Sequence, residues 1–253
     1  MSINIKMDTG TANTTVAKGR SIEWIVIHYT AGTSSAAGSA HNLAAWFRAG
    51  ANPANPASAD FIVDDENVVC YNPDIANRYS WGAGGVKYTK MSTSEGGRYY
   101  GKCRNSNCIN IEICSNKKNR KSLSADDTDW YFTDAELALA AELVKHLMKT
   151  YGISADHVIM HHQVTGKLCP AYWVHGDGLI RFRKQVEEVG EVVATMCQNE
   201  QAIDSVLIAK KEFIRILIPF LTDVKSGKGI DNLRVYINSA WEARRKATRQ
   251  ASR

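Results

Sequence analysis

The 253-residue sequence lacks the long apolar runs of a membrane protein. No stretch approaches the about 18 uncharged apolar residues that a membrane-spanning helix needs. The N-terminal stretch from Met1 to Arg20 contains no apolar segment of the kind found in secretory signals, and no internal repeat is visible. We therefore expect a protein that is made in the cytoplasm and stays there unless something else releases it. In that reducing compartment the six cysteines are expected to be free thiols or metal ligands rather than a disulfide framework.

The net positive charge of the chain is concentrated at its C-terminal end. The stretch from Lys225 to Arg253 contains eight Lys or Arg and two acids, so it carries +6, and because the whole chain carries +5 the remainder carries −1. Two helical patterns, at 201–224 and 231–250, also set this end apart. With 44% hydrophobic and 23% charged residues the chain is otherwise an ordinary globular protein. We expect one large domain at 1–198 and a basic helical appendage at 199–253.

Alternating strand and helix patterns predict an α/β fold for the large domain. The apolar run "EWIVIHYT" is typical of a strand buried on both faces, and "INIEIC" alternates, with isoleucines on one face and Asn110 and Glu112 on the other. The sequence "TDAE" at Thr133–Glu136 is a capping box that begins a helix. Residues 81–107 are polar and rich in glycine, so we expect loops over a cleft. The remaining expected elements are a helix at 34–50, a hairpin turning at 64–67, a strand at 157–161 and a helix from 177.

Several candidate metal-binding and catalytic residues lie close together in "VIMHHQVTGKLCP". They are His161, His162, Lys167 and Cys169. Neutral imidazole and thiolate are ligands that zinc prefers. On an extended strand the two histidines would point to opposite faces, so one zinc ion would take only one of them, and alternation does not say which. The Thr-Gly step at 165–166 supplies a turn that lets the lysine and the cysteine face one cleft. The alternative is a chance histidine pair and a buried cysteine, but His28 at the end of a predicted strand favours a metal site.

These motifs resemble the zinc-dependent N-acetylmuramoyl-L-alanine amidases of phage endolysins, which are related to peptidoglycan recognition proteins. The matching stretches are "IVIHYTAG", "ASADFIVDD", "WGAG", "NSNCINIEICSN" and "MHHQVTGKLCP". The resemblance implies a central mixed β-sheet flanked by helices. It also implies that Zn²⁺ is held by His28, His161 and Cys169, with a fourth position open for a water nucleophile. By the same resemblance Glu112 is the general base, and Lys167 stabilises the oxyanion.

The sequence departs from the family pattern at positions expected to line the cleft. Ala59 and Asp60 stand where many relatives carry an aromatic residue and a histidine, and Gly82 stands where many carry a histidine after Trp81. We expect these departures to affect substrate contacts more than zinc chemistry. Asp60, Trp81 and Asn110 are the candidate substrate-binding residues, although Trp81 could equally be a core residue and Asn110 could simply face solvent.

The resemblance implies hydrolysis of the amide between N-acetylmuramic acid and L-alanine in peptidoglycan by an endolysin that reaches the wall through a holin. Three alternatives remain: a non-catalytic peptidoglycan-binding module, a host cytoplasmic wall-recycling amidase, and a regulatory partner of a phage polymerase. We expect the basic appendage to bind anionic wall polymers or membrane lipid, or to pair two chains into a homo-oligomer. No familiar wall-binding repeat and no nucleic-acid-binding motif is visible.

Overall fold

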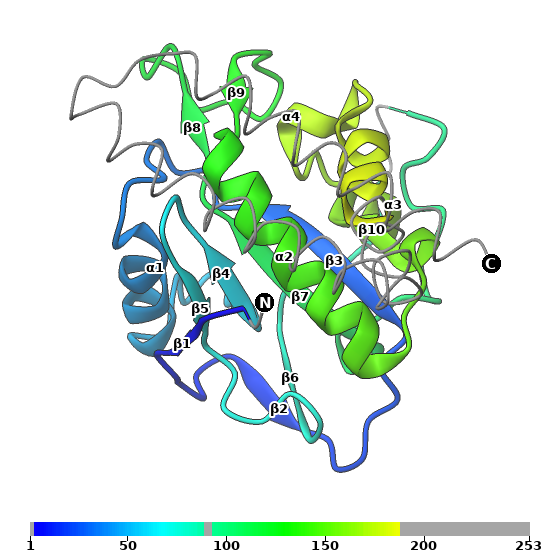
Figure 1. Cartoon of the computed structure of the whole chain (residues 1–253). Coiled ribbons are helices and arrows are strands. Elements are labelled where there is room, and N and C mark those ends of the chain that lie inside the picture. The colour runs from blue at the N-terminus through cyan, green and yellow to red at the C-terminus, as the bar shows by residue number, and fades with distance from the viewer. Residues whose placement is uncertain (1–2, 89–92, 188–253) are drawn as a thin grey trace, which may run out of the picture. The chain divides into compact units, whose positions relative to one another are not determined.

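A six-stranded β-sheet lies at the centre of the part of the chain that the computed structural model describes, residues 3–88 and 93–187 (Figure 1). The strands are β1 (Ile5–Met7), β3 (Trp24–Tyr29), β4 (Phe61–Val63), β5 (Val68–Cys70), β7 (Cys108–Ile113) and β10 (Val158–Met160), in the order β1-β5-β4-β7-β3-β10. Two small sheets pair β2 (Thr14–Val16) with β6 (Arg78–Ser80), and β8 (Asn116–Lys117) with β9 (Trp130–Tyr131). Within these residues no helix has both the length and the apolar character of a membrane span.

The helices are α1 (Ser39–Arg48), α2 (Asp134–Tyr151), α3 (His161–Thr165) and α4 (Ala171–Val174), with 3-10 turns η1 (Asn105–Asn107) and η2 (Ala155–His157). Residues 178–187 are also helical. The predicted mixed sheet flanked by helices is confirmed, as are the helices expected from 133 and 177, whereas the helix expected at 34–50 begins only at Ser39. The small strands β1, β2, β6, β8 and β9 were not predicted, because segments of two or three residues carry no periodic pattern.

The direction of the strands determines where side chains can meet. Strands β4, β7, β3 and β10 are parallel to one another, and β5 returns antiparallel to β4 across the predicted hairpin. In the register of β3 and β7, His28 is the partner of Glu112. On the other side of β3, Ile27 is the partner of Met160, the last residue of β10. The carboxyl ends of these three strands therefore meet at one edge, where open α/β sheets usually bind ligands.

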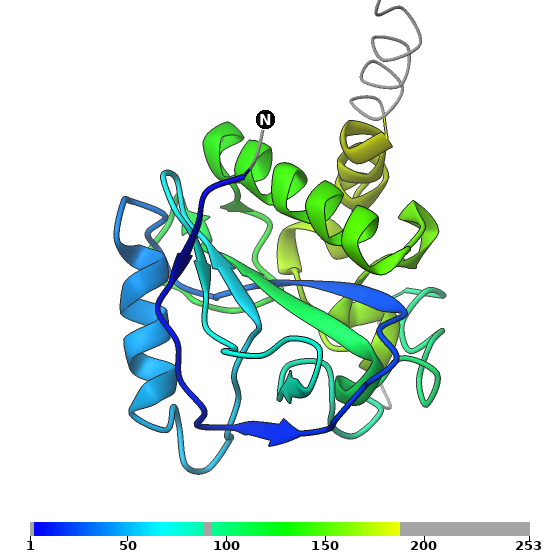
Figure 2. The same ribbon diagram turned by 60° about the horizontal axis from the view of Figure 1, so that its bottom comes forward.

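The two faces of the sheet have different covers. Alternate residues such as Ile25, Ile109 and Ile111 pack with α2 and the 178–187 helix in one cluster, whereas Ile62 and Val69 pack with α1 in another. In Figure 2, α2 crosses above the sheet and α1 stands at its left. The isoleucines of β7 therefore face α2, as the alternation predicted, and Asn110 and Glu112 project to the opposite face.

Helix α2 begins and ends where its sequence signals predict. The Oγ1 atom of Thr133 accepts a hydrogen bond from the backbone nitrogen of Glu136 at 3.2 Å, and the Glu136 carboxylate accepts one from the backbone nitrogen of Thr133 at 2.7 Å. The helix ends at Gly152, whose φ of 68° is left-handed and suits glycine. The predicted capping box is therefore confirmed.

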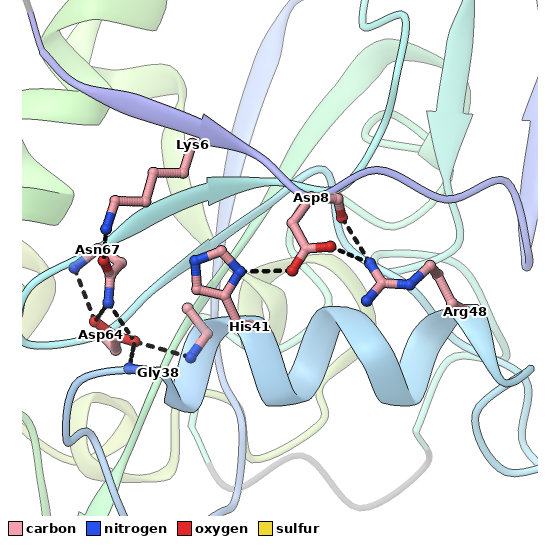
Figure 3. Close-up of polar contacts among 8 residues, drawn as sticks. Lys6, Asp8, Gly38, His41, Arg48, Asp64 and Asn67 are labelled. Atoms are coloured by element: carbon pink, nitrogen blue, oxygen red, sulfur yellow. Dashed lines mark hydrogen bonds and ion pairs between the residues drawn. The ribbon is translucent and has the colours of Figure 1, made fainter.

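Helix α1 is tied to the sheet by charged side chains from other segments (Figure 3). The Oδ2 atom of Asp64 accepts hydrogen bonds from the backbone nitrogens of Gly38 at 2.9 Å and Ala40 at 3.0 Å, so a carboxylate from the hairpin turn caps the helix N-terminus. Further along the helix, His41 and Arg48 both pair with Asp8, which follows β1. These contacts fix α1 against the β1 and β5 edge of the sheet.

Residues 81–107 contain no strand or helix longer than η1 among those the structure describes. Part of this segment packs on α3, since the backbone nitrogen of Gly97 donates to the His162 carbonyl at 3.0 Å and that of Tyr99 donates to the Gln163 carbonyl at 2.8 Å. Together they line a hollow of about 370 Å³ whose walls include Tyr100, Arg104 and Asn105. The predicted appendage at 199–253 lies outside the described residues.

Candidate metal and active site

Three candidate zinc ligands meet at the carboxyl edge of the sheet. One potential donor atom each from His28, His161 and Cys169 lies within 4.8 Å of the others. His28 is the fifth residue of β3, His161 directly follows β10, and Cys169 lies in the loop after α3. All three side chains are buried, with exposures of 2%, 5% and 2%. Segments far apart in the sequence thus form one cluster, since 141 positions separate His28 from Cys169.

The expectation that the two adjacent histidines lie on an extended strand was wrong. Strand β10 ends at Met160, and His161 and His162 are the first residues of α3, so strand alternation does not separate them. Helical geometry does, because neighbouring residues on a helix point about 100° apart. The His161 ring meets His28 edge to face, with ring centroids 4.8 Å apart.

His162 points elsewhere and both of its ring nitrogens are occupied. Its Nδ1 donates to the carbonyl oxygen of Lys167 at 3.0 Å, and its Nε2 lies 2.7 Å from the Thr93 hydroxyl, which donates to it. Its backbone nitrogen donates to the Cys169 carbonyl at 2.9 Å. The side chain is fully buried. His162 therefore holds the loop that carries Lys167 and Cys169, a role that sequence reasoning missed.

The buried environment keeps both histidines of the cluster neutral. Burial lowers the pKa of His28 to about 3, and the charge of Lys167 adds to this effect. Burial also lowers the pKa of His161 well below its usual range. Neutral imidazole is the form that binds metal, so both side chains are in the required state at neutral pH.

Burial has the opposite consequence for the cysteine. It raises the pKa of the Cys169 thiol to about 12, although the positive charge of Lys167 and a hydrogen bond from the backbone nitrogen of Tyr29 favour the thiolate. A bound divalent cation deprotonates a coordinating thiol outright. The site therefore suits a thiolate only when a metal ion supplies the compensating charge.

The spacing of one donor pair in the cluster fits Zn²⁺. Ligand bonds of about 2.0–2.3 Å at tetrahedral angles place two donors roughly 3.3–3.8 Å apart. The Nδ1 atom of His28 lies 3.7 Å from the Sγ atom of Cys169. In the described part of the chain, the buried Nδ1 atom of His161 has no hydrogen-bond partner. Because buried polar atoms are nearly always paired, an unpaired ring nitrogen on one of the three clustered side chains supports a metal site.

Glu112 lies directly beside His28 on the neighbouring strand β7. Its Oε2 atom is buried and has no partner among the described residues. Burial raises the pKa of this carboxyl to about 8, while the charge of Lys167 lowers it. Lys167 is exposed in the loop between α3 and Cys169, and its positive charge influences His28, Glu112 and Cys169. Four of the residues assigned by resemblance, His28, Glu112, His161 and Cys169, thus lie together, and the role of Lys167 stays a prediction.

The expected substrate contacts fare differently. Asp60 and Asn110 have no exposed surface, and their side chains hydrogen bond inside the protein, so the structure gives no support to the expectation that they contact substrate. The Oδ1 atom of Asn110 instead lies 3.1 Å from the Nε2 atom of His28. Trp81 is 38% exposed, and its indole nitrogen donates to the Thr15 hydroxyl at 2.8 Å. A role for Trp81 in binding substrate stays a prediction.

The family of the chain follows from comparison with known proteins. The model of the N-acetylmuramoyl-L-alanine amidase family, type 2, matches residues 18–172, which include the whole candidate site. The chain belongs to this family.

Individual relatives agree with that assignment. The amidase CwlL of Bacillus licheniformis is 28% identical over 203 residues, which cover 74% of this chain and 48% of the relative. A probable N-acetylmuramoyl-L-alanine amidase of the same organism is 37% identical over 86 residues, 34% of this chain and 21% of the relative. The chain thus spans less than half the length of these curated relatives.

Two solved structures share the fold over almost their whole length. The catalytic domain of XlyA has a TM-score of 0.51 at 26% identity, over 73% of this chain and 99% of that structure. A mutant endolysin from Bacillus subtilis has a TM-score of 0.50 at 25% identity, with the same shares of the two chains.

Proposed function

We propose that this chain is a zinc-dependent amidase that hydrolyses the bond between N-acetylmuramic acid and the L-alanine of the stem peptide in peptidoglycan. The observation that carries the proposal is the buried cluster of His28, His161 and Cys169 with Glu112 in register beside it. Family membership gives the reaction class, and the cluster supplies the groups that such a reaction needs.

Bound to these three side chains, Zn²⁺ would keep one open coordination position and lower the pKa of a water molecule toward neutrality. Glu112 takes a proton from the water as its oxygen attacks the carbonyl carbon of the scissile amide. The carboxyl then gives this proton to the amide nitrogen, so that the bond breaks and the L-alanine amine leaves. Lys167 donates to the carbonyl oxygen while that oxygen carries negative charge.

The burial of Glu112 suits both halves of this proton transfer. A pKa raised to about 8 by burial keeps the carboxyl close to the pH at which it must both accept and release a proton. The nearby positive charge of Lys167 favours the ionised form that accepts the first proton. The exposure of Lys167 leaves its amine free to meet substrate.

The biological setting that we propose is host lysis by a phage or prophage endolysin. The likeness to the B. subtilis endolysin over nearly all of that structure supports this setting. The enzyme would then act on the wall after release from the cytoplasm through a holin. A non-catalytic binding module would not require Cys169, Glu112 and Lys167 to converge, and neither a wall-recycling role nor a polymerase partner has a supporting observation.

Digestion of purified peptidoglycan tests the reaction. We expect new amino groups from L-alanine and no new reducing sugar ends, with activity lost on chelation and restored by Zn²⁺. Mass spectrometry of the fragments identifies the bond that is cut. A rise in reducing ends would show a glycosidase and would overturn the proposal.

We also propose that residues 225–253 attract anionic wall polymers, because they carry +6 on a chain that is otherwise close to neutral. A chain ending at Gln198 should still cleave a soluble muramyl peptide but act more slowly on intact walls. Salt should reduce the difference, since the Debye length is ~8 Å at physiological ionic strength. Equal wall binding by both forms at low salt contradicts this idea, and sedimentation of both forms tests whether the segment instead pairs two chains.

A further inference from the structure

His28 is the end of a chain of buried hydrogen bonds that runs through three other side chains. The Nε2 atom of His28 lies 3.1 Å from Oδ1 of Asn110, and Nδ2 of Asn110 donates to the Ser80 hydroxyl at 2.9 Å. That hydroxyl donates to Oδ2 of Asp60 at 2.8 Å. All three partners have no exposed surface, and His28 is 2% exposed. Water therefore does not compete for these bonds.

The carboxylate of Asp60 is held by further donors. The backbone nitrogen of Asn110 donates to its Oδ2 atom at 2.8 Å, and Nδ2 of Asn72 donates to its Oδ1 atom at 2.7 Å. With the Ser80 hydroxyl, three donors converge on one buried side chain. The Asp60 carboxylate thus accepts hydrogen bonds, and this fixes which atoms donate and which accept along the rest of the chain to His28.

The direction of the bonds selects one tautomer of His28. Because the Ser80 hydroxyl donates to Asp60, it accepts from the amide nitrogen of Asn110, and the amide oxygen must then face His28. An amide oxygen only accepts, so the hydrogen of the neutral imidazole must be on Nε2. Nδ1 keeps its lone pair, and it is the atom that lies 3.7 Å from Sγ of Cys169.

The space for Asn110 depends on a glycine. A Cβ atom at Gly82 would lie 2.6 Å from Cγ of Asn110, closer than two carbon atoms can approach. Asp60 and Gly82 are two positions at which the sequence departs from the family pattern that it resembles, and both face Asn110. Both departures therefore meet at Asn110, the residue whose amide oxygen lies against His28.

We propose that Asp60, Ser80 and Asn110 are positioning residues that fix the orientation and tautomer of His28 for zinc, and that Gly82 provides the room for them. This inference rests on the proposed zinc site. Outer partners of metal-bound histidines typically contribute about 10–100-fold in metal affinity. We expect that range for Asn110, and a loss toward its lower end when only the Ser80 link is removed.

The test uses Asn110→Leu, which keeps the size of the side chain and removes its hydrogen bonds. The matched control is Asn67→Leu, since Asn67 is also a buried asparagine but bonds to Asp64 beside α1. We expect Asn110→Leu to weaken Zn²⁺ binding, measured by chelator competition, by about 10–100-fold. Asn67→Leu should leave Zn²⁺ affinity unchanged.

The tautomer gives a second readout that a general loss of stability would not change. In metal-free wild-type protein, ¹⁵N–¹H correlation of the His28 ring should show hydrogen on Nε2. Asn110→Leu should lose this preference. Ser80→Ala is a smaller change that should weaken the preference, and it keeps the test possible if the leucine variant does not fold.

Space at Gly82 gives a double-mutant test. Gly82→Ala alone should lower Zn²⁺ affinity because it displaces Asn110, whereas in an Asn110→Ala background it should have no further effect. Additive losses would overturn the inferred role of Gly82. The hydrogen-bond chain from His28 through Asn110 and Ser80 to Asp60 is here called the relay. Its inferred role would be overturned if Asn110→Leu and Ser80→Ala both kept the wild-type Zn²⁺ affinity and the wild-type tautomer of His28. Absence of zinc binding by the wild type would instead overturn the proposed function, and the tautomer in metal-free protein would then decide the relay.

Discussion

The two halves of the candidate site are built by different means. The strand half consists of His28 and Glu112 on the adjacent strands β3 and β7, which are paired along their whole length. The loop half consists of His161, Lys167 and Cys169, which come from the short helix α3 and the loop after it. A ladder of backbone bonds fixes the first half, whereas the second has no regular partner strand beyond Met160.

The loop half depends on one residue that is not a candidate ligand. His162 bonds to the carbonyls of Lys167 and Cys169, and its own carbonyl accepts from the backbone nitrogens of Gly97 and Gly166. The strand half has its side-chain relay to Asp60 instead. We therefore expect substitutions in the strand half to change metal affinity and chemistry, whereas substitutions around His162 should first lower stability.

The largest effect is expected when each of the two adjacent histidines is replaced by alanine in a separate variant. His161→Ala should lose bound zinc and activity, because it removes one of three ligands. The loss of zinc affinity should exceed the about 10–100-fold that is typical when an outer hydrogen-bond partner of a ligand is removed. His162→Ala should still bind one zinc per folded chain but should be less stable. Metal analysis of the two purified variants, with Cys169→Ser as a second ligand variant, measures both. Loss of zinc from His162→Ala alone would reverse the assignment.

A smaller loss, confined to rate, is expected at Glu112. Glu112→Gln should bind zinc as the wild type does but lose ~10²–10⁴-fold in rate, which is the usual contribution of a positioned acid or base. Turnover of a soluble muramyl peptide by zinc-loaded protein measures it. Near-normal turnover would remove Glu112 from the mechanism and leave the strand half with His28 alone.

The same substitution should change how stability depends on pH in metal-free protein. The Glu112 carboxyl has an ordinary pKa of 4.5 when unfolded and, because of burial, a pKa of about 8 when folded. Between these values the folded state keeps a proton that the unfolded state has lost, so stability falls as pH rises from 4.5 to 8. Glutamine does not titrate, so the advantage of Glu112→Gln over wild type should grow across this window.

Denaturant unfolding with chelator present at pH 5 and pH 8 checks this expectation. Glu142→Gln, on the exposed side of α2, is the matched control and should gain less. A Glu112→Gln advantage that does not change with pH would contradict a raised pKa at this site. Added Zn²⁺ should reduce the advantage, because its positive charge favours the ionised carboxyl.

Periodicity predicted most of the strand half. The run ending in His28 and the alternation around Glu112 give the correct strands, and parallel strands with the same direction must bring their carboxyl ends together. The tertiary partners were not predictable in this way. Asp60 and Asn110 were expected in the cleft because polar residues near a site suggest contact with substrate, and only the fold shows them fully buried.

The loop half was assigned by resemblance rather than by local pattern. A strand was expected to run through His161, but it stops at Met160 because the chain turns into α3. Nothing in the sequence linked Thr93 to His162, which are 69 positions apart. A buried histidine bonded through both nitrogens has no sequence signature, so its role could not be separated from that of its neighbour by spacing alone.

The smallest predicted effect distinguishes support of the loop from support of the metal. Thr93→Val keeps the shape of the side chain but removes the hydroxyl that donates to Nε2 of His162. One such bond contributes about 0.5–1.5 kcal/mol, so the free energy of unfolding should fall by that amount. Zinc affinity should not change, since Nδ1 of His162 still holds the Lys167 carbonyl and the His28 relay is untouched. Chelator competition beside denaturant unfolding measures both quantities. If Thr93→Val weakened zinc binding as much as Asn110→Leu, the two halves would act as one unit, and the contrast between them would not hold.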